Sequence, residues 1–236
     1  MKYRPENDDE RRFLAAYRKK NWPRPAVTAD VAAFALLDGA LSILLVRRGD
    51  YPCRGQWALP GGFVDVGDSF DDQGEDIAET AARELGEETG IAAGSVPLLQ
   101  LRAFGRPDRD PRTRIITVLY LATVPATLAR RAQAGDDAAA AEWIPLDRLD
   151  RIALAFDHAD LVRCARLRLA ELLFEGLLAG LLLPGSFTAA QLRGYLAQAT
   201  GRSVDARQFG RRLRRLVDDG VLRRVGPARP ARYRYR

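Results

Sequence analysis

The chain has 236 residues, with 37 lysines and arginines against 31 aspartates and glutamates for a formal net charge of +6, and 47% of it is hydrophobic. This composition is globular, and the length allows a sizeable core without disulfides or structural metal. The presence of only Cys53, Cys164 and a single His158 argues against a disulfide framework and a Cys/His zinc site. Because no apolar run reaches the ~18–20 residues of a membrane span and no signal-peptide pattern opens the chain, we expect a cytoplasmic protein.

The charge is distributed unevenly along the chain. Residues 185–236 carry 13 arginines, no lysine and three aspartates, a net charge of +10, whereas residues 1–184 carry −4. This asymmetry predicts two domains, of which the smaller is strongly cationic. Clustered arginine favours binding to a polyanion such as nucleic acid. A general preference for arginine over lysine, 34 against 3 in the whole chain, is the alternative explanation.

The first two thirds of the chain alternate helical and extended patterns irregularly. Residues 6–20 read as an amphipathic helix that Pro23 and Pro25 bring to an end. Asp38-Gly39 is a typical hairpin turn. The further predicted elements are strands at 27–37, 41–47, 96–104, 114–123 and 142–145, a long loop at 48–73 and a helix at 76–89. We therefore expect an α/β fold with a mixed sheet.

From residue 157 onward the pattern is mainly helical. A long helix with Asp157 as its cap is predicted to run to about residue 179. Two helices at 186–199 and 205–219 and a hairpin at 221–235 then follow in the order of a winged helix-turn-helix. The expected division is an N-terminal helical extension 1–25, an α/β domain 26–156, a linking helix 157–184 and a winged-helix domain 185–236.

The helix at 76–89 carries the most informative residues. Glu84, Glu87 and Glu88 stand at i, i+3 and i+4, so they share one face and repel one another. Clustered carboxylates on a rigid element suit Mg²⁺ or Mn²⁺. A solvated acidic face paired with Arg83 is the alternative. Asp76 with Glu79 as a capping box, and Gly90 at the position after the helix, specify both ends of the helix.

The run 75–91 resembles the signature of the Nudix hydrolases in every charged residue, both apolar positions and the closing glycine. Residues 57–64 resemble the family's approach to this signature. The family pattern has a glycine where this chain has Ser69, so we infer an insertion of seven residues near 67–73. The resemblance implies the Nudix α/β/α sandwich for the larger domain.

The resemblance also implies the roles of the signature residues. Arg83 and Glu75 orient the metal-binding carboxylates in such enzymes, which split a nucleoside diphosphate linked to another group. The metal ligands implied for Mg²⁺ or Mn²⁺ are Glu84, Glu87 and Glu88. Asp137 and Glu142 are candidates for the general base, and each is equally well explained as an ordinary loop carboxylate.

The loop 104–114 is the expected substrate-binding segment. Its arginines, which could clamp phosphates, are Arg106, Arg109, Arg112 and Arg114. Phe104 or Tyr51 could stack on a base, although such aromatics often belong to the core. A charged surface loop is the alternative. The loop is similar to those of the ADP-ribose-handling and transcription-regulating branches of the Nudix superfamily, which favours ADP-ribose as the ligand.

The basic C-terminal helix is predicted to face the core with Phe209, Leu213, Leu216 and Val217. Its outward side is then able to enter a DNA groove. The DNA-binding candidates are Arg207, Gln208, Arg211, Arg212 and Arg215 on the helix and Arg232 and Arg234 on the wing. A basic hairpin that packs on the larger domain is the alternative. Together with the short segment 155–159, this layout resembles the Nudix-related transcriptional regulators of NAD metabolism.

Two functions follow from these features. The first is a Mg²⁺-dependent hydrolase that converts ADP-ribose to AMP and ribose 5-phosphate. The second is a regulator that senses ADP-ribose and binds double-stranded DNA through the winged helix, as a homodimer on a two-fold site. Because every carboxylate of the signature is present, the sequence favours catalysis.

Overall fold

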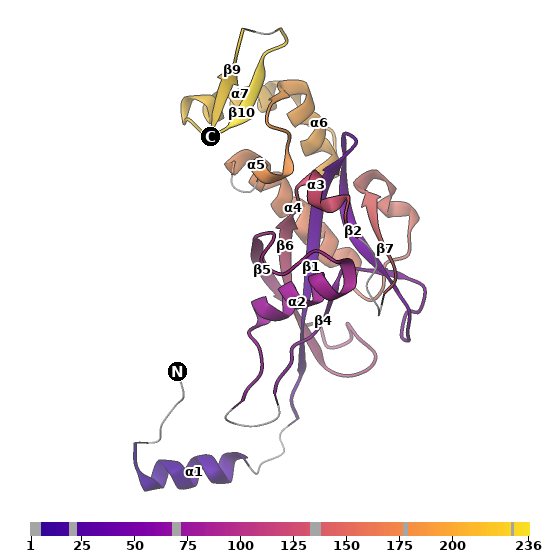
Figure 1. Ribbon diagram of the computed structural model, residues 1–236, viewed down its shortest axis with the longest axis vertical. Coiled ribbons are helices and arrows are strands. Elements are labelled where there is room, and N and C mark those ends of the chain that lie inside the picture. Colours follow the sequence, from indigo (N-terminus) through magenta and orange to yellow (C-terminus); the bar gives the residue numbers. More distant parts are fainter. Residues whose placement is uncertain (1–5, 19–22, 68–71, 133–137, 177–178, 228) are drawn as a thin grey trace.

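A computed structural model of the chain describes residues 6–18, 23–67, 72–132, 138–176, 179–227 and 229–236 (Figure 1). The larger part is built on one sheet in the order β3-β2-β1-β6-β5, with β4 beside β1 and β7 beside β2. Strands β1 and β6 run parallel and the other pairs antiparallel, so the predicted mixed sheet is confirmed. The strands are β1 (Ala26–Leu37), β2 (Ala40–Arg48), β3 (Trp57–Ala58), β4 (Gly61–Phe63), β5 (Leu98–Phe104), β6 (Ile115–Thr123) and β7 (Ala138–Pro145).

Helices cover both faces of this sheet. In β1, Phe34 packs in the same apolar cluster as helix α4 (His158–Glu175), whereas the adjacent Ala33 and Ala35 pack in the cluster of helix α2 (Ile77–Thr89). This alternation follows from the two-residue period of a strand, and the absence of polar side chains here lets both faces be buried. The α/β class is therefore confirmed, with α2 and α4 on opposite sides of β1 (Figure 1). The connecting elements are α3 (Ala126–Ala129) and the 3-10 helix η1 (Leu146–Arg151).

The predicted helix 157–179 is interrupted. Helix α4 ends at Glu175 because Gly176 adopts a left-handed φ of 78°, and a separate short helix α5 (Ala179–Leu182) follows. Such a glycine commonly closes a helix. Asp157 does stand at the first cap position of α4, but its carboxylate makes no capping hydrogen bond. That side chain is engaged elsewhere, as described below.

The C-terminal part has the predicted order of two helices and a hairpin. Thr188 caps the first helix by a reciprocal pair of hydrogen bonds with Gln191. A short strand that the sequence did not indicate joins the hairpin in a three-stranded sheet, β8-β10-β9. The elements are β8 (Phe187–Thr188), α6 (Ala189–Thr200), α7 (Ala206–Asp218), β9 (Leu222–Val225) and β10 (Arg232–Tyr235). Helix α4 packs against both parts, since one apolar cluster contains residues of β1, α4, α6 and α7.

Two further differences from the sequence prediction concern length and position. The loop 48–73 contains β3 and β4, which are too short to give a periodic pattern, and β7 begins four residues earlier than expected, within an alanine-rich stretch. The predicted N-terminal helix is present as α1 (Asp8–Arg18), and it lies apart from the rest of the molecule (Figure 1). In the described part of the chain, no helix combines the length and apolarity that crossing a membrane requires.

Candidate active site

Helix α2 is held in one orientation by its ends and by its buried face. The Asp76 carboxylate accepts a hydrogen bond from the Ala78 N–H at 2.9 Å, and the Glu79 carboxylate accepts one from the Asp76 N–H at 2.8 Å, which completes the predicted capping box. Gly90 closes the helix with a left-handed φ of 71°. The side of α2 that packs toward the sheet buries Thr80, Ala81, Leu85 and Thr89. The acidic side chains, which lie beside this buried side, are therefore presented in a fixed direction.

The segment 67–73, where the sequence suggests an insertion, leaves the start of this helix in contact with residue 65. The Asp65 carbonyl accepts a hydrogen bond from the Glu75 N–H at 3.0 Å, and the Asp65 N–H donates to Glu75 Oε1 at 3.0 Å. Gly67 and Gly74 flank the insertion with left-handed φ values, and a Cβ on Gly74 would lie 1.8 Å from the Asp65 oxygen. The chain thus leaves and re-enters at nearly one point, so the residues on either side keep their contact.

Arg83 organises the acidic side chains around it. Its guanidinium donates two hydrogen bonds to Glu75, at 2.7 and 3.1 Å, and one each to Glu84 at 2.8 Å and Glu87 at 2.9 Å. A further bond at 3.1 Å reaches the Phe63 carbonyl and ties the network to β4. The Arg83 hydrogen bonds lower the pKa of Glu75 to about 2. Charge-assisted bonds of this kind fix carboxylate orientation.

Two carboxylates of the signature are withdrawn from solvent. The Glu84 side chain is 14% exposed and lies against Gly62, where an added Cβ would come 2.2 Å from its Oε1. Glu88 Oε2 accepts a hydrogen bond from the Gly61 N–H at 2.9 Å. Burial raises the pKa of Glu84 and raises that of Glu88 to about 8. Such groups become anions readily only when a positive charge is close.

The acidic face suits a divalent cation. Its donors are carboxylate oxygens, which Mg²⁺ and Mn²⁺ favour, and a cation there would offset the burial of Glu84 and Glu88. Glu87 is 60% exposed and lies at the rim. Within the described residues, no three His, Cys, Asp or Glu side chains converge as metal ligands, and the Arg83 guanidinium provides the positive charge beside Glu84 and Glu87.

A cavity of about 610 Å³ opens beside Glu88. Its wall combines cations with aromatic rings. The cations are Arg47, Arg48, Arg109 and Arg112, and the rings are Tyr51, Phe63 and Phe156. Guanidinium groups bind phosphate oxygens, and aromatic faces accept flat rings. A pocket with carboxylates at one end and this wall is suited to a molecule that carries both phosphates and a base.

A comparison with protein families decides the identity of this domain. Residues 27–164 match the family model of the NUDIX domain, which is more than half of the chain. The chain belongs to the Nudix family. The resemblance inferred from residues 75–91 is therefore confirmed. Nudix hydrolases generally use divalent metal ions, which agrees with the oxygen donors of α2.

Three known proteins are similar to this Nudix chain. The ADPR responsive transcriptional repressor NtrR of Acinetobacter baylyi is 34% identical over 241 residues, covering 100% of this chain and 92% of the repressor. An ADP-ribose pyrophosphatase of Methanocaldococcus jannaschii is 35% identical over 65% of this chain and 79% of its own length. The crystal structure of Shewanella oneidensis NrtR complexed with a 27mer DNA superposes with a TM-score of 0.64, at 28% identity, over 89% of this chain and 93% of that one.

Only part of the predicted substrate loop reaches the Nudix pocket. Arg109 and Arg112 line it, whereas the other three candidates do not. Phe104 packs at the end of β5 against the core, with the Arg102 guanidinium 4.9 Å from its ring. Arg106 pairs with the exposed Asp108 at 2.8 Å. Arg114 is exposed outside the cavity.

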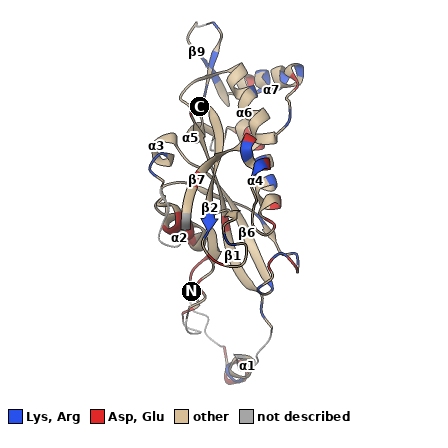
Figure 2. Cartoon of the chain, turned by 90° about the vertical axis from the view of Figure 1, so that its right-hand side faces the viewer, with Lys and Arg blue, Asp and Glu red and all other residues tan. Residues whose placement is uncertain are grey.

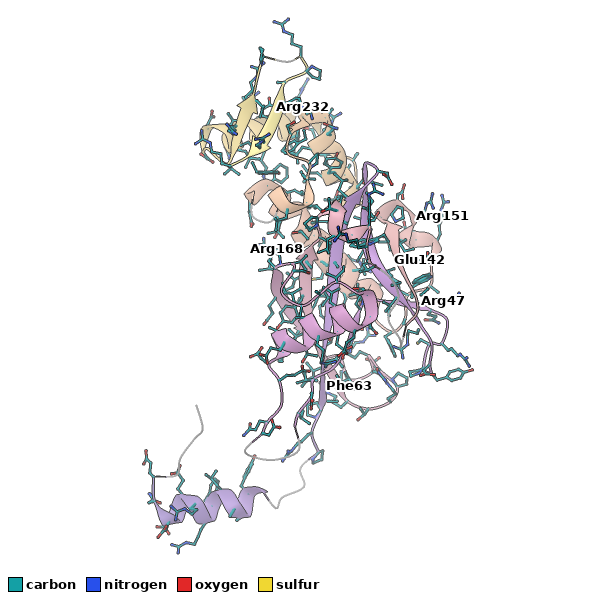
Figure 3. The ribbon with its side chains drawn as sticks, in the orientation of Figure 1. Arg47, Phe63, Glu142, Arg151, Arg168 and Arg232 are labelled. Atoms are coloured by element: carbon teal, nitrogen blue, oxygen red, sulfur yellow. The ribbon has the colours of Figure 1, made fainter. Side chains whose placement is uncertain are left out.

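Neither general-base candidate is seen in the pocket. Asp137 lies outside the described residues. Glu142 is exposed on β7, where it pairs with Leu45 of β2, and it does not line the cavity. Figure 3 shows Glu142 well separated from Phe63, which does line it.

The two loop arginines that do reach the pocket are each held by a carboxylate. Arg109 donates two hydrogen bonds to Asp157, at 2.8 and 3.0 Å, and both side chains are almost completely buried, at 4% and 6% exposed. This pair joins the substrate loop to the start of α4. Arg112 donates two bonds to the buried Asp110, at 2.8 and 3.1 Å, and stays 39% exposed. Arg112 is therefore the more available of the two for a ligand.

Several pocket residues were missed by sequence reasoning. Phe156 holds a left-handed φ of 51°, unusual for an aromatic residue, and its ring lies 4.8 Å from the Arg48 guanidinium and 5.7 Å from that of Arg112. Strained backbone of this kind is concentrated at functional sites. Asp30 and His158 form the floor of the cavity. The segment 155–159 had pointed to the family but had given no sign of these roles.

Helix α7 of the C-terminal part presents its basic residues as predicted. Phe209, Leu213 and Leu216 are buried, and the polar candidates, Arg207, Gln208, Arg211, Arg212 and Arg215, are exposed. In Figure 2, many positions along α7 are blue, and α7 lies well apart from α2, where acidic positions are red. Arg212 differs from the others because its guanidinium stacks 3.7 Å from the Phe174 ring of α4.

The two wing arginines are bound to the neighbouring loop. Arg232 donates to the hydroxyl and the carbonyl of Ser186, at 3.0 and 2.6 Å, and Arg234 donates to the Gly185 carbonyl at 2.5 Å. They were predicted to contact DNA, and their engagement with the loop was not predicted. Arg223 and Arg224 of β9 are exposed instead, and sequence reasoning had not singled them out.

Proposed function

We propose that this Nudix protein hydrolyses ADP-ribose to AMP and ribose 5-phosphate with Mg²⁺ or Mn²⁺. The observation that carries the proposal is the pocket beside the half-buried signature carboxylate Glu88, which faces a wall of arginines and aromatic rings. The similarity to an ADP-ribose pyrophosphatase and to an ADPR responsive repressor supports the choice of ligand. All signature carboxylates are present, which supports catalysis rather than binding alone.

Each side chain has a role in this proposal. Glu84 and Glu88 would hold the ion, with Glu87 at the exposed rim and Arg83 fixing carboxylate orientation. When bound, the ion neutralises the diphosphate and lowers the pKa of the attacking water. Arg112, whose bidentate bond to Asp110 leaves N–H groups free, binds phosphate oxygens on the substrate. The fixed position of these groups restricts the diphosphate to one orientation.

The test is direct product analysis. The full chain is incubated with ADP-ribose in ¹⁸O-labelled water with Mg²⁺, Mn²⁺ or excess EDTA, and products are identified by mass spectrometry. We expect AMP and ribose 5-phosphate in equal amounts with either ion, one of them carrying ¹⁸O, and no product with EDTA. If no AMP forms with either ion while other nucleoside diphosphate derivatives are cleaved, ADP-ribose is not the substrate and one of those derivatives takes its place.

A second function is supported by helix α7. We propose that the C-terminal part binds double-stranded DNA as a homodimer, with α7 in the major groove, and that ADP-ribose in the Nudix pocket changes this affinity. The exposed arginines of α7 support DNA binding, since phosphate contacts and guanine recognition both use arginine. The match to NrtR complexed with a 27mer DNA supports the same assignment.

The DNA proposal is tested by fluorescence anisotropy on duplexes selected from a random pool by the full chain. We expect a two-fold repeat in the selected sequences, a steep fall of affinity with salt, and a change of affinity on adding ADP-ribose. A pool that shows no enrichment and no binding at low salt would remove this function and leave the hydrolase untouched.

A further inference from the structure

One buried polar side chain of the pocket floor has no role in the chemistry so far. His158 is 5% exposed and lies at the start of α4, some 70 positions from the Nudix signature. Its Nδ1 accepts a hydrogen bond from the Leu59 N–H at 3.0 Å. Burial lowers the pKa of His158, so the ring is neutral and carries its proton on Nε2. The ring therefore acts as an acceptor toward one backbone group.

That backbone group begins the turn that holds Glu88. Two residues after Leu59, the Gly61 N–H donates to Glu88 Oε2 at 2.9 Å. Between them, the Pro60 carbonyl accepts a bond from the Val31 N–H at 2.8 Å. Three consecutive residues thus bind three different elements, namely α4, β1 and α2. A shift at Leu59 is passed to the orientation of the Glu88 carboxylate.

The turn has little freedom to relax if one of these bonds is lost. A Cβ on Gly61 would lie 2.3 Å from the Ala29 carbonyl oxygen and 2.7 Å from Asp30 Oδ1, so the backbone is pressed against β1. Asp30 is itself held by Thr117, whose hydroxyl donates to Asp30 Oδ2 at 2.5 Å. The turn can therefore adjust mainly at its Leu59 end, where His158 is the partner.

The segment before His158 is anchored strongly enough to serve as a support. The Ala155 N–H donates to the Trp57 carbonyl at 2.8 Å, and the Trp57 N–H donates to the Ala153 carbonyl at 3.0 Å. Asp157 forms the buried ion pair with Arg109. Residues 153–158 thus join the turn, the substrate loop and α4.

We propose that His158 is a positioning residue, which holds the Leu59–Gly61 turn so that the Gly61 N–H aims the Glu88 carboxylate at the bound cation. The expected change in kcat rests on the proposed metal-dependent activity. The expected change in cation affinity does not depend on which substrate the protein cleaves. When a residue that holds a metal ligand in position is replaced, metal affinity or activity typically falls by roughly 10- to 100-fold.

Three substitutions separate positioning from simple packing. His158→Asn keeps an acceptor, because its side-chain oxygen is as many bonds from Cα as Nδ1. His158→Gln fills similar space but extends its amide toward the position of Nε2. His158→Leu fills the space and provides no acceptor. Asp160→Asn serves as the matched control, since Asp160 lies in the same first turn of α4 but its side chain is 47% exposed and pairs with Arg163 at the surface.

The primary measurement is the Kd for Mn²⁺, obtained by electron paramagnetic resonance on the full chain without substrate. We expect His158→Leu and His158→Gln to weaken Mn²⁺ binding by roughly 10- to 100-fold, and His158→Asn and Asp160→Asn to stay within about threefold of the parent. With ADP-ribose, the same two variants should lower kcat while KM changes little.

Equal Mn²⁺ affinity in the parent, His158→Leu and His158→Gln would overturn the proposal, and so would equal losses in the Asn and Gln variants. Thermal unfolding identifies any variant that fails to fold. If His158→Leu is unfolded, the proposal is tested by comparing the Mn²⁺ affinities of His158→Asn and His158→Gln. A parent that binds Mn²⁺ but cleaves no ADP-ribose would count against the proposed substrate, and the Mn²⁺ series would still test His158.

Discussion

Helices α2 and α7 each carry a row of like charges, but the structure treats the two rows in opposite ways. On α2, the carboxylates are paired with Arg83 or a backbone N–H, and Glu84 and Glu88 are partly withdrawn from water, whereas the arginines of α7, coloured blue in Figure 2, are exposed. Buried charges must be fixed by partners or they destabilise the fold. Exposed charges are solvated and need no partner in the protein, and exposed arginines contribute binding free energy when a polyanion binds. The first arrangement suits chemistry at one point and the second suits binding along a surface.

The contrast between buried and exposed charge is tested most strongly by two arginines. Arg109→Ala leaves the Asp157 carboxylate buried without its partner, so we expect a loss of about 3–5 kcal/mol in the free energy of unfolding. Arg211→Ala, on the exposed side of α7, should change it by less than about 0.5 kcal/mol. Urea unfolding measures both. A small loss for Arg109→Ala with a large rise in KM would instead make Arg109 a phosphate ligand.

The two regions should also separate in function. We expect Glu88→Gln to lower kcat/KM for ADP-ribose by at least about 100-fold, or ~2.7 kcal/mol, because an amide is a poor ligand for a divalent cation. Since the pKa of Glu88 is raised to about 8, the metal-free carboxyl is mostly protonated at pH 7, and the amide should not impair folding. DNA affinity without ADP-ribose should be unchanged.

Glu171→Gln is the control for this experiment, because Glu171 is an exposed surface partner of Arg168 on α4. It should retain the activity of the parent. Normal turnover in Glu88→Gln would refute the metal assignment of α2, and a simultaneous loss of DNA binding would show that the two regions are not independent.

The sequence predicted both charged helices because their caps and periodicity are local. Asp76, Glu79 and Gly90 fix α2 within fifteen residues, and the spacing of Phe209 and Leu213 fixes the buried side of α7. The pairing of side chains across the fold could not be predicted in this way.

Arg109 shows most clearly which contacts the sequence does not predict. As one of four similar arginines in a loop, it carries no local mark of the buried carboxylate 48 positions away that binds it. His158 and Phe156 are brought to the pocket by the pairing of β3 with residues 153–155, which the sequence pattern does not show. Sequence spacing thus predicted the helices, the main strands and the acidic residues of α2. The wall of the pocket could not be predicted, because it is formed by contacts between residues far apart in the chain.

A smaller effect is expected from single arginines of α7 in DNA binding. Arg211→Ala and Arg215→Ala should each weaken binding to all duplexes alike and reduce the slope of log affinity against log salt by about 1, as for a residue that contacts a phosphate. Arg168→Ala is the matched control, since Arg168 lies on α4 and is held by Glu171 and Glu175. A loss confined to one DNA sequence would assign the arginine to a base instead.

The smallest effect concerns the pH dependence of stability at the start of α2. Arg83 lowers the pKa of Glu75 from 4.5 to about 2, so this carboxylate stabilises the folded state above pH 4.5, and the contribution is lost as the pH falls toward 2. We expect Glu75→Gln to be less stable than the parent by about 1 kcal/mol at pH 7, with the difference shrinking between pH 5 and pH 2.5. Urea midpoints at pH 7, 5, 4 and 3 measure it. A difference that stays constant over this range would mean that Glu75 stabilises α2 through packing rather than through its charge.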